Sequence, residues 1–295
     1  MNVSIIIVTR GMSELVDTLA KRLSSLLSEA APGVVGEVLV VAEDLAVEEP
    51  GTRVPLDSGA LLVRIPAKRG LGYNRNRAIE AAQGDVIVFV DDDCWPADDW
   101  LGELLSPLAD LSIDGVMGNV HIRPSSFLGD SISALGFPGG GTAGFEVMFP
   151  VDVEGFTPHI STLNCALRQT MFSRVGTFDE SMVAGAEDGE FSHRMASAGV
   201  RVKFQPTAMV DHAARDSLTE FARWFFRRGR AARQYSRKVA PGGAIGRRIA
   251  SYGRIVWMHR TDPKLVAIVP LLAASVLLQQ AGFIRELIAE KRACD

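Results

Sequence analysis

The stretch "GDVIVFVDDDCWP" at residues 84–96 decides the fold. Residues 85–90 form a short apolar run rich in β-branched side chains, which predicts a strand buried on both faces. Three consecutive acids follow it, Asp91, Asp92 and Asp93. A solvated turn remains one interpretation, but a turn needs one such residue rather than three. The stretch therefore predicts a buried strand that ends in a functional acidic cluster.

Similar apolar runs alternate with helical patterns through the first 120 residues. Such alternation is typical of crossover units on a mostly parallel sheet and predicts an α/β fold. The predicted strands cover residues 3–8, 37–42, 60–65 and 85–90, and the predicted helices cover residues 13–30 and 71–83.

The ends of these strands carry polar side chains. In open sheets of this kind, ligands bind beyond the carboxyl ends of the strands, so the side chains there should converge on one crevice. The expected residues are Thr9, Arg10, Glu43, Asp44, Asp91, Asp92 and Asp93.

Crowded carboxylates must be partly protonated, solvated or bound to a cation. At the end of a buried strand, we expect cation binding rather than protonation or solvation of the carboxylates. Oxygen ligands suit Mg²⁺ or Mn²⁺ that carries substrate phosphates. The cluster therefore predicts a divalent-ion site.

Several other protein classes place acids at a strand end. A phosphohydrolase of the haloacid-dehalogenase type would use Asp91 as a nucleophile, but its motif normally opens the chain and continues into Thr or Val. A dinucleotide dehydrogenase would need a G-x-G-x-x-G turn after the first strand, and "TRGMSE" does not supply it. The phosphohydrolase and a non-catalytic nucleotide-sugar-binding protein remain as alternatives.

Three segments, in this order, resemble the inverting glycosyltransferases of family 2, which have the GT-A fold. They are "SIIIVTR" at residues 4–10, "GLGYNRNRAIEAAQGDVIVFVDDD" at 70–93, and "GTFDESMVAGAEDGEFSHRMASAGVRVKFQPTAMVDH" at 176–212. The resemblance implies transfer of a sugar from a nucleotide-diphosphate donor to an acceptor hydroxyl, with inversion at the anomeric carbon. It also implies a bound Mg²⁺ or Mn²⁺.

The resemblance also assigns roles on the donor side. Thr9 and Arg10 lie against the base and ribose, and Arg75 reaches the nucleotide. Asp91 and Asp93 are the two acids of the DxD motif, with Asp93 as the direct metal ligand. Ala42 stands where the family commonly has an Asp that reads uracil, so Glu43 or Asp44 would serve only with a shifted register. The sequence therefore leaves the base and the sugar open.

On the acceptor side, the resemblance assigns Asp188 of the Glu187–Asp188 pair as the catalytic base. A carboxylate at the start of a helix is kept ionised by the helix dipole, which suits this role. His212 matches a position that completes the metal site in some members. Simple helix capping by the acidic pair and a structural role for His212 are the alternatives.

The rest of the first 215 residues contains less pattern. Residues 122–158 are rich in Gly, Pro and Ser and predict a long loop that orders over substrate. Regular structure should resume at 159–176, followed by a helix over 186–199 and strands at 200–205 and 208–212.

Charge divides the chain into an acidic front and a basic rear. Residues 1–220 contain 31 acidic and 16 basic residues, whereas residues 221–261 contain 11 basic residues and no acid. The overall charge of −4 and pI of 5.8 argue against a general nucleic-acid-binding protein. The pattern of residues 218–238 predicts a basic amphipathic helix, and residues 265–284 are uncharged over a length sufficient to cross a bilayer.

These features predict a membrane-associated C-terminal section at 216–295 behind a GT-A domain at 1–215. Within that domain, residues 1–120 are the nucleotide-sugar half and 121–215 the acceptor half. A helix packed over the acceptor site is the alternative for the basic segment, and a buried helix is the alternative for the apolar one. The three widely spaced cysteines fit neither a disulfide framework nor a zinc site, and no export signal is visible. We therefore expect a cytoplasmic protein at the inner face of the membrane, where a lipid-linked acceptor or a cell-envelope glycan would be within reach.

Overall fold

The computed structural model describes residues 1–136, 149–239 and 252–294. Contacts divide the chain into two units. The sheet unit comprises residues 1–120, 149–183 and 187–212, and the helical unit comprises residues 121–148, 184–186 and 213–295. The boundary predicted at residue 215 stays a prediction, and residues 121–148 group with the C-terminal section rather than with the sheet.

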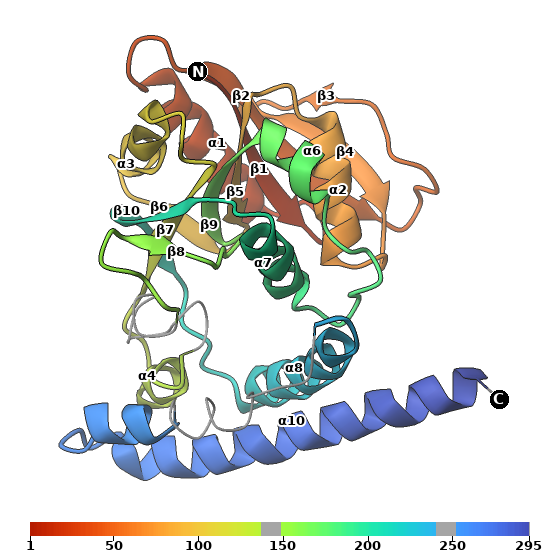
Figure 1. Ribbon diagram of the computed structural model, residues 1–295, viewed down its shortest axis with the longest axis vertical. Coiled ribbons are helices and arrows are strands. Elements are labelled where there is room, and N and C mark those ends of the chain that lie inside the picture. Colours follow the sequence, from red (N-terminus) through yellow and green to blue (C-terminus); the bar gives the residue numbers. More distant parts are fainter. Residues whose placement is uncertain (137–148, 240–251, 295) are drawn as a thin grey trace. The chain divides into compact units, whose positions relative to one another are not determined.

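Four parallel strands form the first part of the sheet (Figure 1). They lie in the order β4-β2-β1-β5. Their bounds are β1 Asn2–Thr9, β2 Val35–Asp44, β4 Leu61–Pro66 and β5 Val86–Asp91. Their middle residues are buried, as the apolar runs predict, except for Arg64 of β4, which is exposed. The four predicted strands are therefore confirmed, and β5 ends at the first of the three aspartates.

Two helices connect these strands. Helix α1 (Glu14–Ser28) begins after Ser13, whose side chain accepts a hydrogen bond from the Val16 amide at 3.3 Å, and it buries one apolar stripe. Helix α2 (Leu71–Ala81) follows Gly70, which has a φ of 99° that favours glycine. Both helices contact β1 and β2, so the predicted crossover units are confirmed.

Beyond β5, the sheet continues with antiparallel pairs. Strand β9 (Asn164–Arg168) lies between β5 and β7 (Gly115–Ile122), and β10 (Val202–His212) and β6 (Cys94–Pro96) follow. The short strands β3 (Val54–Pro55) and β8 (Phe156–Thr157) pair with β4 and β10. The two strands predicted at 200–205 and 208–212 are one strand, because Pro206 lies at an exposed position where a missing amide is tolerated.

The remaining helices of the sheet unit are α3 (Trp100–Leu105), the 3₁₀ helix η1 (Ser106–Ala109), α6 (Gln169–Val175) and α7 (Glu187–Ser197). Helix α7 confirms the helix predicted from the "AEDGEFSHRMASAG" pattern. Asn164, which is fully buried, holds this part together by accepting from the Trp100 indole at 2.9 Å and donating to the carbonyls of Asn119 and Ala208 at 2.8 Å.

The helical unit contains α4 (Phe127–Ser133), α8 (Leu218–Lys238), a helical segment at 252–258 and α10 (Leu265–Cys294). The prediction of a loop throughout 122–158 is wrong at α4, where the Ser126 side chain caps a helix. The rest of that loop at 137–148, and residues 240–251 of the basic stretch, lie outside the described residues. Helix α8 has the predicted bounds.

One apolar cluster unites the helices of this unit. It is formed by Ile132, Ala134, Leu135, Phe221, Phe225, Ile255, Ile268, Leu271 and Leu272. Helices α8 and α10 pack side by side (Figure 1) and approach closely at Gly229 and Gly282, where a Cβ atom would collide with backbone of the other helix. Among the described residues, α10 alone has the length and apolar composition to cross a membrane, and 33% of its apolar window is buried.

Candidate active site

The carboxyl ends of three parallel strands meet at one edge of the sheet. Thr9 on β1 is in register with Ala42 on β2, and Val8 is in register with Asp91 on β5. Thr9, Glu43 and Asp91 therefore end neighbouring strands at the same edge, as expected from the sequence.

The first strand leads into a tight turn. The Thr9 side chain is buried, and its hydroxyl donates a hydrogen bond to the Gly11 carbonyl at 2.9 Å. Arg10, between them, is exposed. The turn thus holds Arg10 at the surface beside the strand ends. The predicted contacts of Thr9 and Arg10 with the donor stay predictions.

The acids that end β2 have protein partners. The Glu43 carboxylate accepts a hydrogen bond from the Asn74 amide at 2.8 Å, which ties β2 to α2. Asp44 accepts from the Ala46 amide at 2.9 Å and from Arg64 at 2.8 Å, and these two contacts lower the pKa of its carboxyl. Asp44 is thus anchored to a turn and to β4, and Glu43 is the acid that is linked to α2.

The predicted metal ligands Asp93 and His212 lie together. Strand β6 pairs with the end of β10 so that Cys94 is opposite His212. The buried His212 ring has its Nε2 atom 3.0 Å from an Asp93 carboxylate oxygen. The ligand atoms of Asp93, Cys94 and His212 all lie within 4.8 Å of one another. Asp92, between the DxD acids, is half-buried.

This donor set fits a divalent ion such as Mn²⁺ or Mg²⁺. Carboxylate oxygen is the preferred donor of both ions, and one imidazole nitrogen is compatible with Mn²⁺. The Cys94 thiol is a soft donor, but burial and then the neighbouring Asp91 and Asp93 charges raise its pKa well above the ordinary value. Cys94 is therefore held as a neutral thiol, which leaves the hard donors to dominate the site.

Asp91 has an unusual protonation equilibrium. Its side chain remains 39% exposed, yet crowding by protein atoms raises the pKa of its carboxyl to about 6. The charges of Asp93 and Asp92 raise this pKa further, whereas Arg75 and His212 lower it. A bound cation would lower this raised pKa, because a positive charge favours the ionised form of the carboxyl.

Arg75 on α2 forms a buried ion pair with Glu187, the first residue of α7. The two side chains are only 6% and 4% exposed, and the Arg75 guanidinium also lies 4.0 Å from an Asp91 oxygen. Burial alone would lower the pKa of Arg75, but the charges of Glu187, Asp91 and Asp188 outweigh burial and raise the pKa. Arg75 therefore joins the DxD strand to the Glu187–Asp188 pair. Its predicted contact with the nucleotide stays a prediction.

Asp188 stands in the first turn of α7 and is half-buried. One of its carboxylate oxygens accepts a hydrogen bond from the Gly189 amide at 2.8 Å. The chain enters this helix through two residues with positive φ, Gly185 at 112° and Ala186 at 65°. For Ala186 this conformation is strained, and strain of this kind is enriched at functional sites. The predictions for Glu187 and Asp188 as catalytic residues are not tested by these contacts.

Sequence reasoning missed Asn76, which fixes the segment before α7. Its buried side-chain amide donates to the Phe178 carbonyl at 2.9 Å and accepts from the Phe178 amide at 2.9 Å. The Phe178 ring in turn lies 5.6 Å from the Arg75 guanidinium. The signal was present in "NRN", in which only the Arg was assigned a role.

Comparisons with known proteins agree with this geometry. The family model described as Glycosyl transferase family 2 matches residues 4–134, and the one described as Glycosyl transferase family 21 matches residues 73–290. The phosphohydrolase alternative is therefore not retained.

Two curated relatives illustrate the match. The chain is similar to the glycosyltransferase AglE of Haloferax volcanii, with 27% identity over 211 residues, 68% of this chain and 64% of that protein. It is also similar to the pre-mycofactocin glycosyltransferase of Mycobacterium tuberculosis, with 28% identity over 61% of this chain and 39% of that protein. The chain thus spans less than two thirds of the length of either relative.

Solved structures with the same architecture have low sequence identity. The mannosyltransferase PcManGT from Pyrobaculum calidifontis, in complex with GDP-Man and Mn²⁺, has a TM-score of 0.55 at 20% identity and covers 99% of this chain and 79% of its own. GalNAc-T7 with UDP, GalNAc and Mn²⁺ has a TM-score of 0.53 at 15% identity over 86% of this chain and 54% of its own. At such identities the likeness establishes the GT-A fold. The family 21 model matches most of the chain and the family 2 model matches its first part, so this chain belongs to the glycosyltransferases that these two models describe.

Proposed function

We propose that this protein transfers a sugar from a nucleotide-diphosphate donor to an acceptor hydroxyl, with inversion at the anomeric carbon. The observation that carries the proposal is the link from the Asp91 strand end through Arg75 to Glu187 and Asp188. This link brings donor-binding acids and a candidate base into one electrostatic network. The nucleotide ligands in two solved relatives, GDP-Man and UDP, support the donor class.

In this proposal, Asp93 and His212 hold a divalent ion and Asp91 supports it. A bound Mg²⁺ or Mn²⁺ would offset the negative charge that develops on the leaving diphosphate. The strand-end residues Thr9 and Arg10 lie against the nucleoside. The proximity of the Asp93 and His212 ligand atoms supports the assignment, as does the Mn²⁺ in solved relatives.

Asp188 acts as the general base of this reaction. It takes the proton from the acceptor hydroxyl as the oxygen attacks the anomeric carbon from the side opposite the diphosphate. The hydrogen bond from the Gly189 amide holds one of its oxygens, and the Arg75 guanidinium, which is paired with Glu187, also interacts with the charge of Asp188. Attack from the opposite side reverses the anomeric configuration.

The proposal includes a lipid-linked acceptor and therefore a location at a membrane. A lipid-linked acceptor at the inner face of a membrane would bring its hydroxyl to a protein that carries a basic and apolar C-terminal section. The support is the long apolar α10 and the basic α8.

The decisive experiment compares Asp93→Ala with Asp188→Asn. Asp93→Ala should lose Mn²⁺-dependent donor binding in thermal-shift titrations with a panel of UDP, GDP and dTDP sugars, because ligand binding stabilises the folded protein by mass action. Asp188→Asn should bind donor normally but lose about 10²–10⁴ in transfer rate. Glu190→Gln, further along α7 in a pair with Arg194, is the matched control and should do neither.

Two results would overturn the assignment. Normal metal-dependent donor binding in folded Asp93→Ala would remove Asp93 from the metal site. Near-normal transfer by Asp188→Asn would reduce Asp188 to a helix cap. Independently, NMR of the product must give a β-linkage from an α-linked donor, and a retained configuration would exclude the single displacement.

A further inference from the structure

Helix α10 buries apolar residues in the cluster described above, and its exposed side is mainly apolar as well. The buried positions along its length include Ser275, Gln279 and Glu286, which are at most 8% exposed. The exposed positions recur at helical spacing and carry mostly aliphatic side chains. The large ones are Val266, Val269, Val276, Leu277, Ile284 and Ile288, exposed by 37–75%.

The exposed face of α10 is unlike that of a helix that faces water. A helix in water has its charged face outward and its apolar stripe inward. Here the outer face, which we call the α10 stripe (the six aliphatic residues just named), presents an apolar surface over most of a helix about 45 Å long, from thirty residues at 1.5 Å each. An exposed apolar surface of this extent indicates a binding partner.

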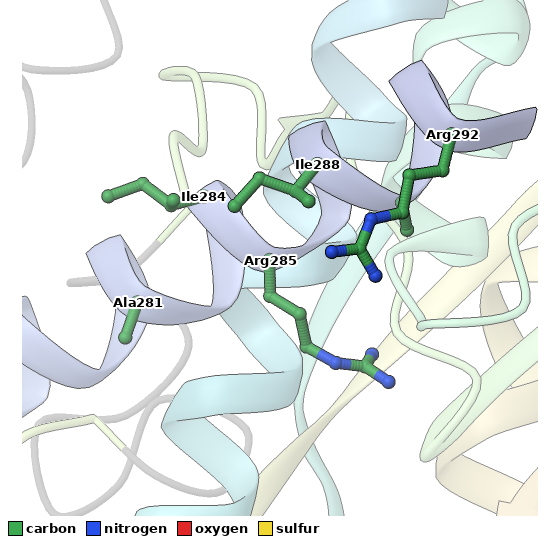
Figure 2. Close-up of a pocket in the computed structure, with 6 residues that line it drawn as sticks. Ala281, Ile284, Arg285, Ile288 and Arg292 are labelled. Carbon is green, nitrogen blue, oxygen red and sulfur yellow. The ribbon is translucent and has the colours of Figure 1, made fainter. Parts of the chain in front are cut away.

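The charges on α10 indicate which partner. Its acids Glu286 and Glu290 are paired with Arg230 and Arg233 of α8 at 2.7 and 2.8 Å. The exposed charges beside the stripe are therefore basic. Figure 2 shows Ile284 and Ile288 along the helix and the side chains of Arg285 and Arg292 extending away from it, and all four residues line one pocket.

The segment before α10 has the same character. Trp257 is 64% exposed, and the Arg260 guanidinium lies 4.3 Å from the centre of its ring. Tryptophan with adjacent basic residues is typical of the boundary between lipid headgroups and acyl chains. Apolar stripe, exposed Trp and basic rim together match an anionic lipid surface.

The packing of α10 argues against a helix that crosses the bilayer. Over residues 279–290 it is covered by α8, whose outer positions include the exposed Arg223, Arg227 and Arg228. A spanning α10 would carry these arginines into hydrocarbon, which is strongly unfavourable. At the other end, Lys264 is paired with Asp130 of α4 at 3.4 Å.

We propose that α10 lies in the plane of an anionic membrane, with the α10 stripe buried among the acyl chains and Arg285, Arg292 and Arg260 against the headgroup phosphates. This inference rests on the membrane location in the proposed function but not on the transfer reaction. The sequence allowed either a helix that spans the bilayer or a helix buried in the protein. The proposed arrangement is neither of these, because one face of α10 packs on the protein and the other face is inserted into the membrane.

The first test is sedimentation of the full-length protein with vesicles of phosphatidylcholine, alone or mixed with phosphatidylglycerol. Binding should require the anionic lipid and weaken with salt. The double variant Leu277→Glu/Ile284→Glu should bind the vesicles at least tenfold more weakly, because it places two negative charges in the α10 stripe. The fold should be kept, because both side chains are exposed in the protein. Leu111→Glu, at an 85% exposed position of the sheet unit, is the matched control and should bind as the unmodified chain does.

The second test measures depth. Nitroxide labels at Val266→Cys, Leu277→Cys and Ile288→Cys, in a Cys294→Ser background, should all report the same shallow depth in anionic vesicles. A depth that is greatest at residue 277 and shallow at both ends would overturn the in-plane arrangement in favour of a spanning helix. Equal vesicle binding by the double variant, or a concentration-dependent dimer that the double variant abolishes without any vesicle binding, would overturn the lipid surface as the partner.

Donor binding, measured by thermal-shift titration without vesicles, tests the proposed transfer reaction independently of the proposed membrane binding. A protein that binds donor but no vesicle contradicts only the membrane inference. A protein that binds vesicles through the α10 stripe but no nucleotide sugar contradicts only the proposed reaction.

Discussion

Replacing Glu187 by Gln should expose how much the sheet unit depends on the buried Arg75–Glu187 pair. The change keeps the size of the side chain and removes its charge. The guanidinium, 6% exposed, then remains buried without its closest counter-charge. Removal of one partner from a buried ion pair typically costs about 3–5 kcal/mol.

The structure places the expected loss at the lower end of this range. Asp91 remains 4.0 Å from the guanidinium and supplies part of the missing charge, and the introduced amide oxygen can still accept a hydrogen bond. A loss of about 3 kcal/mol corresponds to a fall of roughly 6–12 °C in Tm for a unit of this size. The variant should also change the pKa of Asp91, because the positive charge of Arg75 is then no longer offset by the negative charge of Glu187. The pKa of Asp91 should fall below its value of about 6.

The assay is thermal unfolding followed by circular dichroism, with Glu80→Gln as control. Glu80 pairs with Arg77 on the same helix as Arg75, but its side chain is 57% exposed, so its loss should change Tm little. The double variant Arg75→Met/Glu187→Leu should recover most of the stability, because it leaves no buried charge without a partner. Equal Tm values for Glu187→Gln and Glu80→Gln would refute the reasoning.

Three further outcomes are expected. Since the pKa of Asp91 is raised to about 6, a proton competes with the divalent ion below that pH. Mn²⁺ affinity measured by calorimetry should therefore be constant above about pH 7 and fall by up to tenfold per pH unit below pH 6, and an affinity that rises on acidification would contradict the assignment. Gly229→Ala should lower Tm because its Cβ would meet backbone of α10, whereas Gly253→Ala, with open space around it, should not, and similar effects of the two would contradict the close helix packing. Cys94 and Cys165 should resist alkylation in the folded protein at pH 8, because burial raises the pKa of both thiols, that of Cys165 to about 12; rapid labelling seen by mass spectrometry would contradict their burial.

The sequence was sufficient for the parallel half of the sheet. Strands β1, β2, β4 and β5 are predominantly apolar runs, and helices α1 and α2 with their own periodicity lie between β1 and β2 and between β4 and β5. The strand ends followed from topology, because parallel strands deliver their carboxyl ends to one edge. The edge predicted to carry Thr9, Glu43 and Asp91 does so.

The antiparallel half was less accessible. Strand β9 is only five residues long and its partners β5 and β7 are distant in sequence, so no local pattern indicates its place between them. Helix α4 lies in a segment of Gly, Pro and Ser that is typical of a loop, and its start depends on the single cap at Ser126. The burial of Arg75 could not be predicted from the sequence either. A charged residue is rarely buried without a partner close in space, and the partner Glu187 is 112 residues away in the sequence.

The position of β9 governs the order in which this protein can fold during synthesis. Residues 164–168 insert between β5 and β7, so the first 120 residues emerge from the ribosome with the edge of β5 uncovered. Arg75 and Asn76 are also made about a hundred residues before the partners Glu187 and Phe178 that satisfy them. An exposed apolar strand edge invites pairing with other chains, and contacts of such long range form slowly. The nascent segment of residues 1–120 is therefore exposed to aggregation during synthesis until β9 and the partners of Arg75 and Asn76 have been translated.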